Sequence, residues 1–188
     1  LKARFPMIFV STWEENRLIN MLCGLGQDQS VIKTCRQVFV WSVTHGVYGV
    51  SGQEFAARGD TTKPQTALEF FESLTEPAVL VIKDFQAFCQ NGGTTADPVI
   101  TRRIRDCAEY LKTDALPKNL VFVDETIDGI PDTLLKHVHV MDLPLPTMKE
   151  LDQVIEQMIE TNKTSGRIAF DLSGCLLYTS PSPRDPSI

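Results

Sequence analysis

The sequence lacks glycine and lysine where a nucleotide-binding α/β protein needs both. Residues 7–10 form an apolar, strand-like run that leads directly into a helical pattern. A phosphate loop at such a junction uses glycines, whose backbone N–H groups approach the anion, and a lysine that reaches the outer phosphates. Glu14 and Glu15 stand there instead, and they would repel a phosphate from the positive end of the helix dipole. Ser11 or Thr12 with a glutamate three residues later has capping-box spacing, so we expect these side chains to close the helix start.

Other motifs are missing as well. No Gly-x-Ser-x-Gly is present, which argues against a serine hydrolase, and no Gly-x-Gly-x-x-Gly follows the first strand, which argues against a dinucleotide site. The glycines of residues 24–26 are placed to end the first helix as a C-cap. No run of about 18 apolar residues is present, so we expect no membrane span.

Cysteine and charge exclude further classes. The five cysteines form no Cys-x-x-Cys pair and have no zinc-site spacing, so reduced, packed thiols are expected. The formal net charge of −6 argues against a nucleic-acid surface. We predict neither membrane nor nucleic-acid partners, no metal site and no catalytic residue. The expected location is the cytoplasm, or the plastid stroma if the gene is plastid-encoded.

Apolar runs alternate with helical patterns along the chain. Nearly continuous hydrophobic runs indicate central parallel strands that are covered on both faces, and an alternating run indicates an edge strand. The sequence therefore predicts an α/β three-layer sandwich with a five-stranded, mostly parallel sheet. The four central runs are residues 7–10, 38–43, 78–82 and 120–123, and the alternating run is residues 137–141.

Helix signals separate these runs. Pro64 suits a first helical position, Asp97 is an N-cap before a proline, and Thr147 with Glu150 has capping-box spacing. Residues 46–63 and 89–96 are rich in glycine or polar residues and are expected to be surface loops.

Two acidic strand ends are candidates for chemistry. Asp84 ends an apolar strand, as a magnesium-holding aspartate does in P-loop enzymes, but Phe85 stands where a companion glutamate would. Asp124 and Glu125 supply both acids after the fourth strand, followed by a predicted loop. In both cases a carboxylate that caps the following turn is the favoured interpretation.

Basic and imidazole side chains are weaker candidates. Arg102, Arg103 and Arg105 could reach a neighbouring subunit, but they lie off the apolar stripe of their helix, which favours a solvated face. His137 and His139 share one side of a strand without a third metal ligand nearby, so an exposed edge strand is expected. A further histidine, at position 45, is expected at a loop or strand end.

Several segments together resemble the N-terminal region of the AAA-type ATPases known as conserved chloroplast and cyanobacterial reading frames. The resemblance covers residues 1–173. Its most specific part is the combination of two motifs, Trp-Glu-Glu after the first strand and Trp-Ser-Val-Thr in and after the second. The segments that carry it are Arg4–Glu15, Val38–Thr44, Val81–Phe85, Ile104–Asp106 and Leu143–Pro146.

The resemblance implies a degenerate AAA-like core, of P-loop NTPase type, that regulates or assembles a parent ATPase. ATP and Mg²⁺ are then expected only in the parent chain, in a downstream AAA module, and a homo-oligomeric ring is a further expectation. No ATP-contacting residue of the family falls on a matching position here, so a cofactor-binding site is not assigned. A stand-alone α/β module that binds a ligand or a protein is the alternative, as is an unconventional nucleotide site.

The resemblance also divides the chain. Residues 1–161 are predicted to be the AAA-like domain and residues 162–174 a linker toward the missing module. Residues 175–188 resemble the translation of a sequencing adapter, although a Pro/Ser-rich flexible tail is also possible. The chain is therefore expected to be a fragment at both ends.

Overall fold

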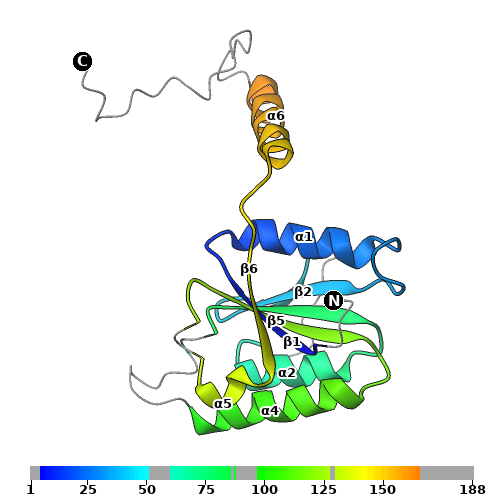
Figure 1. Cartoon of the computed structure of the whole chain (residues 1–188), viewed down its shortest axis with the longest axis vertical. Helices are drawn as coiled ribbons and strands as arrows, with labels where there is room; N and C mark the ends of the chain where they lie inside the picture. Colours follow the sequence, from blue (N-terminus) through cyan, green and yellow to red (C-terminus); the bar gives the residue numbers. More distant parts are fainter. Residues whose placement is uncertain (1–4, 51–59, 86, 88–96, 128–129, 166–188) are drawn as a thin grey trace, which may run out of the picture. The chain divides into compact units, whose positions relative to one another are not determined.

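Six strands form one sheet in the order β3-β2-β4-β5-β1-β6 (Figure 1). The computed structural model describes residues 5–50, 60–85, 87, 97–127 and 130–165. Neighbouring strands are parallel except β2 and β3, which form an antiparallel hairpin. The strands are β1 (Met7–Ser11), β2 (Gln37–Ser42), β3 (Gly46–Gly49), β4 (Ala78–Lys83), β5 (Lys118–Asp124) and β6 (Val138–Asp142).

The predicted α/β sandwich is confirmed, but the strand count is corrected from five to six. β3 lies inside the segment 46–63 that was expected to be a loop, and residues 51–59 of that segment lie outside the described part of the chain. Gly46 has φ +66, and a Cβ there would lie 2.5 Å from the Thr61 hydroxyl. The buried Thr61 accepts a hydrogen bond from the Val47 N–H at 2.9 Å. A strand of four residues with a glycine at each end gives too little periodicity to be predicted.

Helices cover both faces of the sheet, which gives the three layers (Figure 1). On one face α1 packs through Leu18, Ile19 and Leu22 on a layer of valines from β2, β4 and β5. On the other face α2, α4 and α5 enclose a second core that is rich in aromatic residues. The helices of this unit are α1 (Glu15–Gln27), α2 (Pro64–Ser73), α4 (Pro98–Thr113) and α5 (Asp132–Leu135).

The predicted starts of the later helices are confirmed. Pro64 opens α2, and the Asp97 carboxylate accepts hydrogen bonds from two N–H groups of the first turn of α4. The Glu150 carboxylate accepts from the Thr147 N–H at 2.7 Å and the Thr147 hydroxyl accepts from the Glu150 N–H at 3.3 Å, which are the two hydrogen bonds of the predicted capping box.

The glycine C-cap predicted for α1 is wrong. The helix continues through both glycines to Gln27, and its C-cap is Asp28. A Cβ at Gly26 would lie 2.8 Å from the carbonyl oxygen of Arg36, whereas a Cβ at Gly24 would meet nothing within 4 Å. Gly26 is therefore required by a close backbone approach.

The chain divides into two compact units, residues 1–143 and 144–188. Within the second unit the structure describes residues up to 165, which include α6 (Met148–Ser165). α6 extends into the segment expected to be a linker. The domain boundary at 161 stays a prediction, and the expected adapter-like tail lies outside the described residues.

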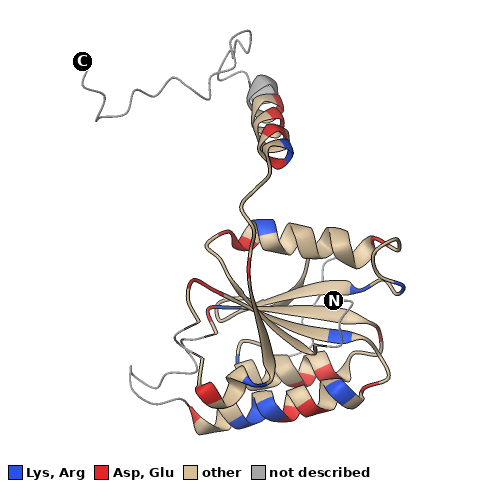
Figure 2. Ribbon diagram, viewed as in Figure 1, with Lys and Arg blue, Asp and Glu red and all other residues tan. Residues whose placement is uncertain are grey.

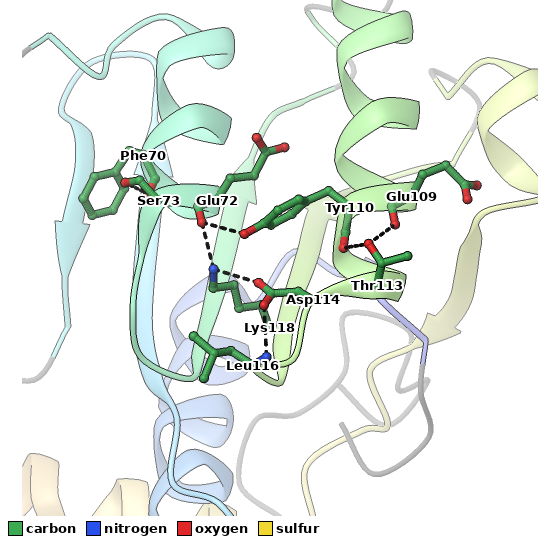
Figure 3. A network of polar contacts seen from close by, with 9 residues as sticks. All are labelled: Phe70, Glu72, Ser73, Glu109, Tyr110, Thr113, Asp114, Leu116 and Lys118. Atoms are coloured by element: carbon green, nitrogen blue, oxygen red, sulfur yellow. Dashed lines mark hydrogen bonds and ion pairs between the residues drawn. The ribbon is translucent and has the colours of Figure 1, made fainter.

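A buried polar network joins α2, α4 and β5 (Figure 3). Lys118, whose side chain is 1% exposed, donates to the Glu72 carbonyl at 2.8 Å and pairs with the Asp114 carboxylate at 2.9 Å. The Tyr110 hydroxyl donates to the same carbonyl at 3.1 Å, and the Lys118 ammonium lies 5.4 Å from the Tyr110 ring centroid. The network fixes the ends of both helices against the start of β5.

The cysteines of the described segments are free thiols, as the sequence predicted. Cys107 lies on the buried face of α4 and is completely enclosed, and burial raises the pKa of its thiol well above the ordinary value. Cys23 and Cys35 are partly buried. A neutral, enclosed thiol such as Cys107 acts as a small apolar side chain.

Candidate functional site

The carboxyl edge of the sheet is the place where ligands of open parallel sheets bind. Here it carries a row of polar residues across four adjacent strands. Ser11 is in register with Asp124 on one side and with Asp142 on the other. Lys83 is in register with Val123, so Asp84, the next residue, comes beside Asp124. The row is therefore aspartate, aspartate, serine, aspartate from β4 through β5 and β1 to β6.

The turn from β1 to α1 is held by hydrogen bonds to the end of β5 and by one hydrogen bond within the turn. The Thr12 N–H donates to the Asp124 carbonyl at 3.0 Å, and the Ser11 hydroxyl donates to the Glu125 carbonyl at 2.8 Å. The Thr12 hydroxyl accepts from the Glu14 N–H at 3.0 Å. Glu14 is itself the N-cap and its side chain makes no capping hydrogen bond, so the predicted capping box is wrong.

An ion pair lies at the first turn of α1. Lys83 Nζ is 2.8 Å from Glu15 Oε2, and the two side chains are 16% and 34% exposed. Glu14 pairs in turn with Arg17 at 2.8 Å. The Glu15 carboxylate thus compensates the positive end of the α1 dipole. Lys83 is ion-paired with this carboxylate and so is not available to bind a ligand.

Asp84 departs from the predicted role. It has φ 51, its N–H donates to the Val123 carbonyl at 3.2 Å, and its carbonyl accepts from the Ala87 N–H at 3.3 Å. The backbone carbonyl, not the carboxylate, therefore stabilises the following turn. The carboxylate is exposed to solvent.

Asp124 has the local role that the sequence favoured. Its side chain is buried, and its carboxylate accepts from the Glu125 N–H at 2.8 Å. The Glu125 side chain is exposed beside it. The two acids are thus a turn cap and a solvated carboxylate.

Trp13 is the site residue that sequence reasoning did not single out as functional. It follows β1 directly and is 76% exposed, whereas Trp41 is completely buried. The Trp41 indole donates to the Thr61 carbonyl at 2.7 Å. A large aromatic residue left in solvent at the ligand-binding edge of the fold was detectable only as the tryptophan of the Trp-Glu-Glu motif.

Comparison with known proteins decides the family. Residues 1–143 match the family described as the SpoVK-like AAA ATPase, N-terminal domain. The chain belongs to this family. The match covers the same residues as the first compact unit.

The curated proteins to which this N-terminal domain is similar are described as AAA domain-containing proteins. The AAA domain-containing protein ycf46 of Pyropia yezoensis is 30% identical over 158 residues, which are 82% of this chain and 29% of that protein. The ycf46 proteins of Trieres chinensis and Guillardia theta are each 27% identical over 164 residues, 86% of this chain. The chain spans less than a third of the length of these relatives.

An AAA ATPase uses ATP, but the α1 start of this N-terminal domain does not fit a triphosphate. It has no glycine loop, two glutamates precede or occupy its first turn, and Lys83 is paired with Glu15. Binding phosphate there would require breaking that pair and placing anions beside carboxylates. We therefore derive no ATP-dependent step at this edge.

The arginines of α4 lie on the other face of the sheet. Arg102 pairs with Asp106 on the solvated side of the helix, as predicted. Arg103 differs, because it forms two hydrogen bonds to the Glu72 carboxylate at 2.7 and 2.8 Å and so joins α4 to α2. This bidentate bond raises the pKa of Arg103. Arg105 is half-buried.

The histidines do not form a site. His137 precedes β6, and its Nδ1 lies 3.8 Å from the Glu109 carboxylate. The His139 ring stacks on Phe5, with 4.8 Å between centroids, on the edge strand that the sequence predicted. The imidazole Nδ1 of His45 lies 2.7 Å from the Thr44 hydroxyl at the turn between β2 and β3.

The described residues contain no group of three or more metal-ligating side chains, and none of their helices could cross a membrane. A hollow of about 90 Å³ opens at the amino ends of β2 and β4, opposite the carboxyl edge. Its lining is Gln37, Phe39, Leu74, Thr75, Glu76, Pro77 and Ala78.

Proposed function

We propose that this domain is a regulatory or assembly domain of an AAA-type ATPase and does not itself hydrolyse ATP. The observation that carries the proposal is the Glu15–Lys83 pair at the start of α1, in a family defined as the N-terminal domain of an AAA ATPase. In this proposal ATP and Mg²⁺ act only in the ATPase module of the full-length protein, and rings of subunits are a further part of it. The cytoplasm, or the plastid stroma for a plastid-encoded copy, remains the proposed location.

The direct test is a titration of the purified chain 1–188 with a fluorescent ATP analogue and Mg²⁺. We expect no saturable binding at micromolar nucleotide. Saturable binding that unlabelled ADP displaces would refute the proposal and establish an unconventional nucleotide site.

A matched pair of variants shows whether the ion pair is responsible. Glu15→Gln removes the carboxylate and leaves Lys83 available, whereas Glu109→Gln removes an exposed carboxylate on α4. If neither variant binds nucleotide, the missing glycine loop is sufficient to exclude phosphate. If only Glu15→Gln binds it, the carboxylate is the decisive obstacle.

The second candidate is a stand-alone α/β module that binds a ligand or a protein, and the exposed Trp13 is compatible with it. The coding sequence that follows Gly174 separates the two. A Gly-x-x-x-x-Gly-Lys-Ser/Thr motif within about one domain length supports the ATPase proposal. A stop codon close behind residue 173 supports the stand-alone module.

A further inference from the structure

We propose that the surface formed by Trp13, Asp84, Glu125 and Asp142, here named the Trp13 surface, docks an arginine-bearing segment of a partner protein. This inference rests on the proposed function, because an assembly domain acts through a docking surface. The four residues lie at the carboxyl ends of four adjacent strands, β4, β5, β1 and β6. Asp84 and Glu125 follow β4 and β5, Asp142 is the last residue of β6, and Trp13 lies in the turn after β1.

The exposed indole is the first argument. Trp13 is 76% exposed, whereas the same residue type at position 41 is completely buried. Exposing a tryptophan leaves a large apolar area in water, and a partner that covers it recovers the free energy of burial. Tryptophan is also enriched among the residues that dominate binding at protein interfaces.

Charge around the indole is the second argument. Three carboxylates of this edge are already paired or buried: Glu14 pairs with Arg17, Glu15 pairs with Lys83, and Asp124 is enclosed. The side chains of Asp84, Glu125 and Asp142 are exposed, and within the described ranges no ion pair to them is formed. Figure 2 shows acidic segments gathered where α1 begins and where the strands end. Such a surface attracts cations and repels nucleic acid and phosphate.

The two arguments together select arginine among cations. A guanidinium stacks on the face of an indole and at the same time donates paired hydrogen bonds to a carboxylate. The lysine ammonium is a compact, strongly hydrated charge that does neither as well. The partner is therefore a protein segment that presents arginine, and lysine should replace it poorly.

The test uses the chain 1–188 with ¹⁵N-labelled tryptophan and the probe peptide acetyl-Gly-Arg-Gly-Arg-Gly-amide. Each tryptophan gives its own indole N–H signal, so Trp41 serves as an internal control. We expect the Trp13 signal to shift saturably while the Trp41 signal stays in place. The lysine version of the peptide should bind about fivefold more weakly, as expected for the stronger arginine–aromatic contact.

Variants separate docking from general attraction between opposite charges. Trp13→Ala should weaken binding of the arginine peptide about tenfold, measured on uniformly ¹⁵N-labelled protein by the shifts of backbone N–H signals at the edge. Glu125→Gln should weaken it less, and Glu109→Gln, on α4, should leave it unchanged. Because Trp13 is largely in solvent, its replacement should leave the melting temperature unchanged, which a thermal scan verifies.

Two results would overturn the inference: equal affinity of the arginine peptide for the wild type and Trp13→Ala, or equal affinity of the arginine and lysine peptides. The nucleotide titration is independent of both. Nucleotide binding together with specific arginine binding would refute the absence of a nucleotide site in this domain and would leave the docking surface supported. Absence of both would refute the docking surface alone.

Discussion

Lys83 Nζ lies 2.8 Å from Glu15 Oε2, although the two residues belong to β4 and to α1, which follows β1. β5 lies between β4 and β1 in the sheet, so the lysine side chain joins parts of the edge that are not adjacent strands. The pair gives the start of α1 an anion and a counter-cation from the chain itself. The start of α1, where folds of this kind commonly bind an anion, is therefore already occupied by a carboxylate and its counter-cation.

The contribution of this pair to stability should be small. Both side chains keep contact with water, so the interaction free energy between them should be about 0.5–1 kcal/mol. A double-mutant cycle of Glu15→Gln and Lys83→Met, followed by urea unfolding, measures it. The value should fall when the salt concentration rises from about 0.05 to 0.5 M, because exposed charges are screened. A coupling above about 2 kcal/mol would contradict a partly solvated pair.

Lys118 should matter far more than an exposed lysine. Lys118→Met removes a cation whose side chain is 1% exposed and leaves the Asp114 carboxylate without its partner. We expect the free energy of unfolding to fall by about 3 kcal/mol. The control is Lys112→Met, which breaks only an exposed pair with Glu109 and should change it by less than about 0.5 kcal/mol. Equal effects in urea unfolding would show that the network of Figure 3 carries no special stability.

Much of the fold could be predicted from the sequence, because buried parallel strands are nearly continuous apolar runs. The runs at β1, β2, β4 and β5 are almost entirely buried, as expected for central strands that helices cover on both faces. β6 was predicted as an edge strand from its alternation, and it pairs only with β1 among the described strands. β3 was missed because its pairing depends on Gly46 and Thr61, which are distant in sequence and leave no local periodicity.

The candidate site was less predictable, because its geometry depends on side chains from separate elements. The sequence showed that Glu15 stands in the first turn of α1, but not that Lys83 reaches it. It also placed Arg103 on a solvated face, whereas the partner that removes it from water, Glu72, lies on another helix. Ion pairs between elements need the tertiary arrangement, and no local pattern encodes them.

The two glycines of α1 should respond in opposite directions to alanine. Gly26→Ala would place a methyl group 2.8 Å from the Arg36 carbonyl oxygen, and this backbone atom cannot move away as easily as the end of a flexible side chain. Its free energy of unfolding should fall by about 1–3 kcal/mol, as for other overpacked sites. At Gly24 there is open space, so alanine should raise the free energy of unfolding by up to about 1 kcal/mol through helix propensity. Thermal unfolding of both variants measures this, and a stabilised Gly26→Ala would show that α1 can move away from the segment before β2.

Stability should also depend on pH through His137. Burial lowers the pKa of His137 below its ordinary value of 6.5, and Lys112, Lys136 and Arg105 add to the effect while Glu109 opposes it. The unfolded chain therefore takes up a proton at a higher pH than the folded domain does. The contribution of His137 is fully present above about pH 6.5 and declines as the pH falls through that value toward the lower pKa of the folded state.

The measurement is urea unfolding between pH 5 and 8. Wild type should lose stability toward pH 5, and His137→Gln should lose less of it over the same range. His139→Gln is the matched control, since that ring lies two residues further along the chain, within β6, and is stacked on Phe5. If His137→Gln and wild type change with pH in parallel, the titrating group lies elsewhere. The half-buried imidazole beside Glu109 would then take up its proton at the same pH in the folded and the unfolded chain, and it would contribute nothing to the pH dependence of stability.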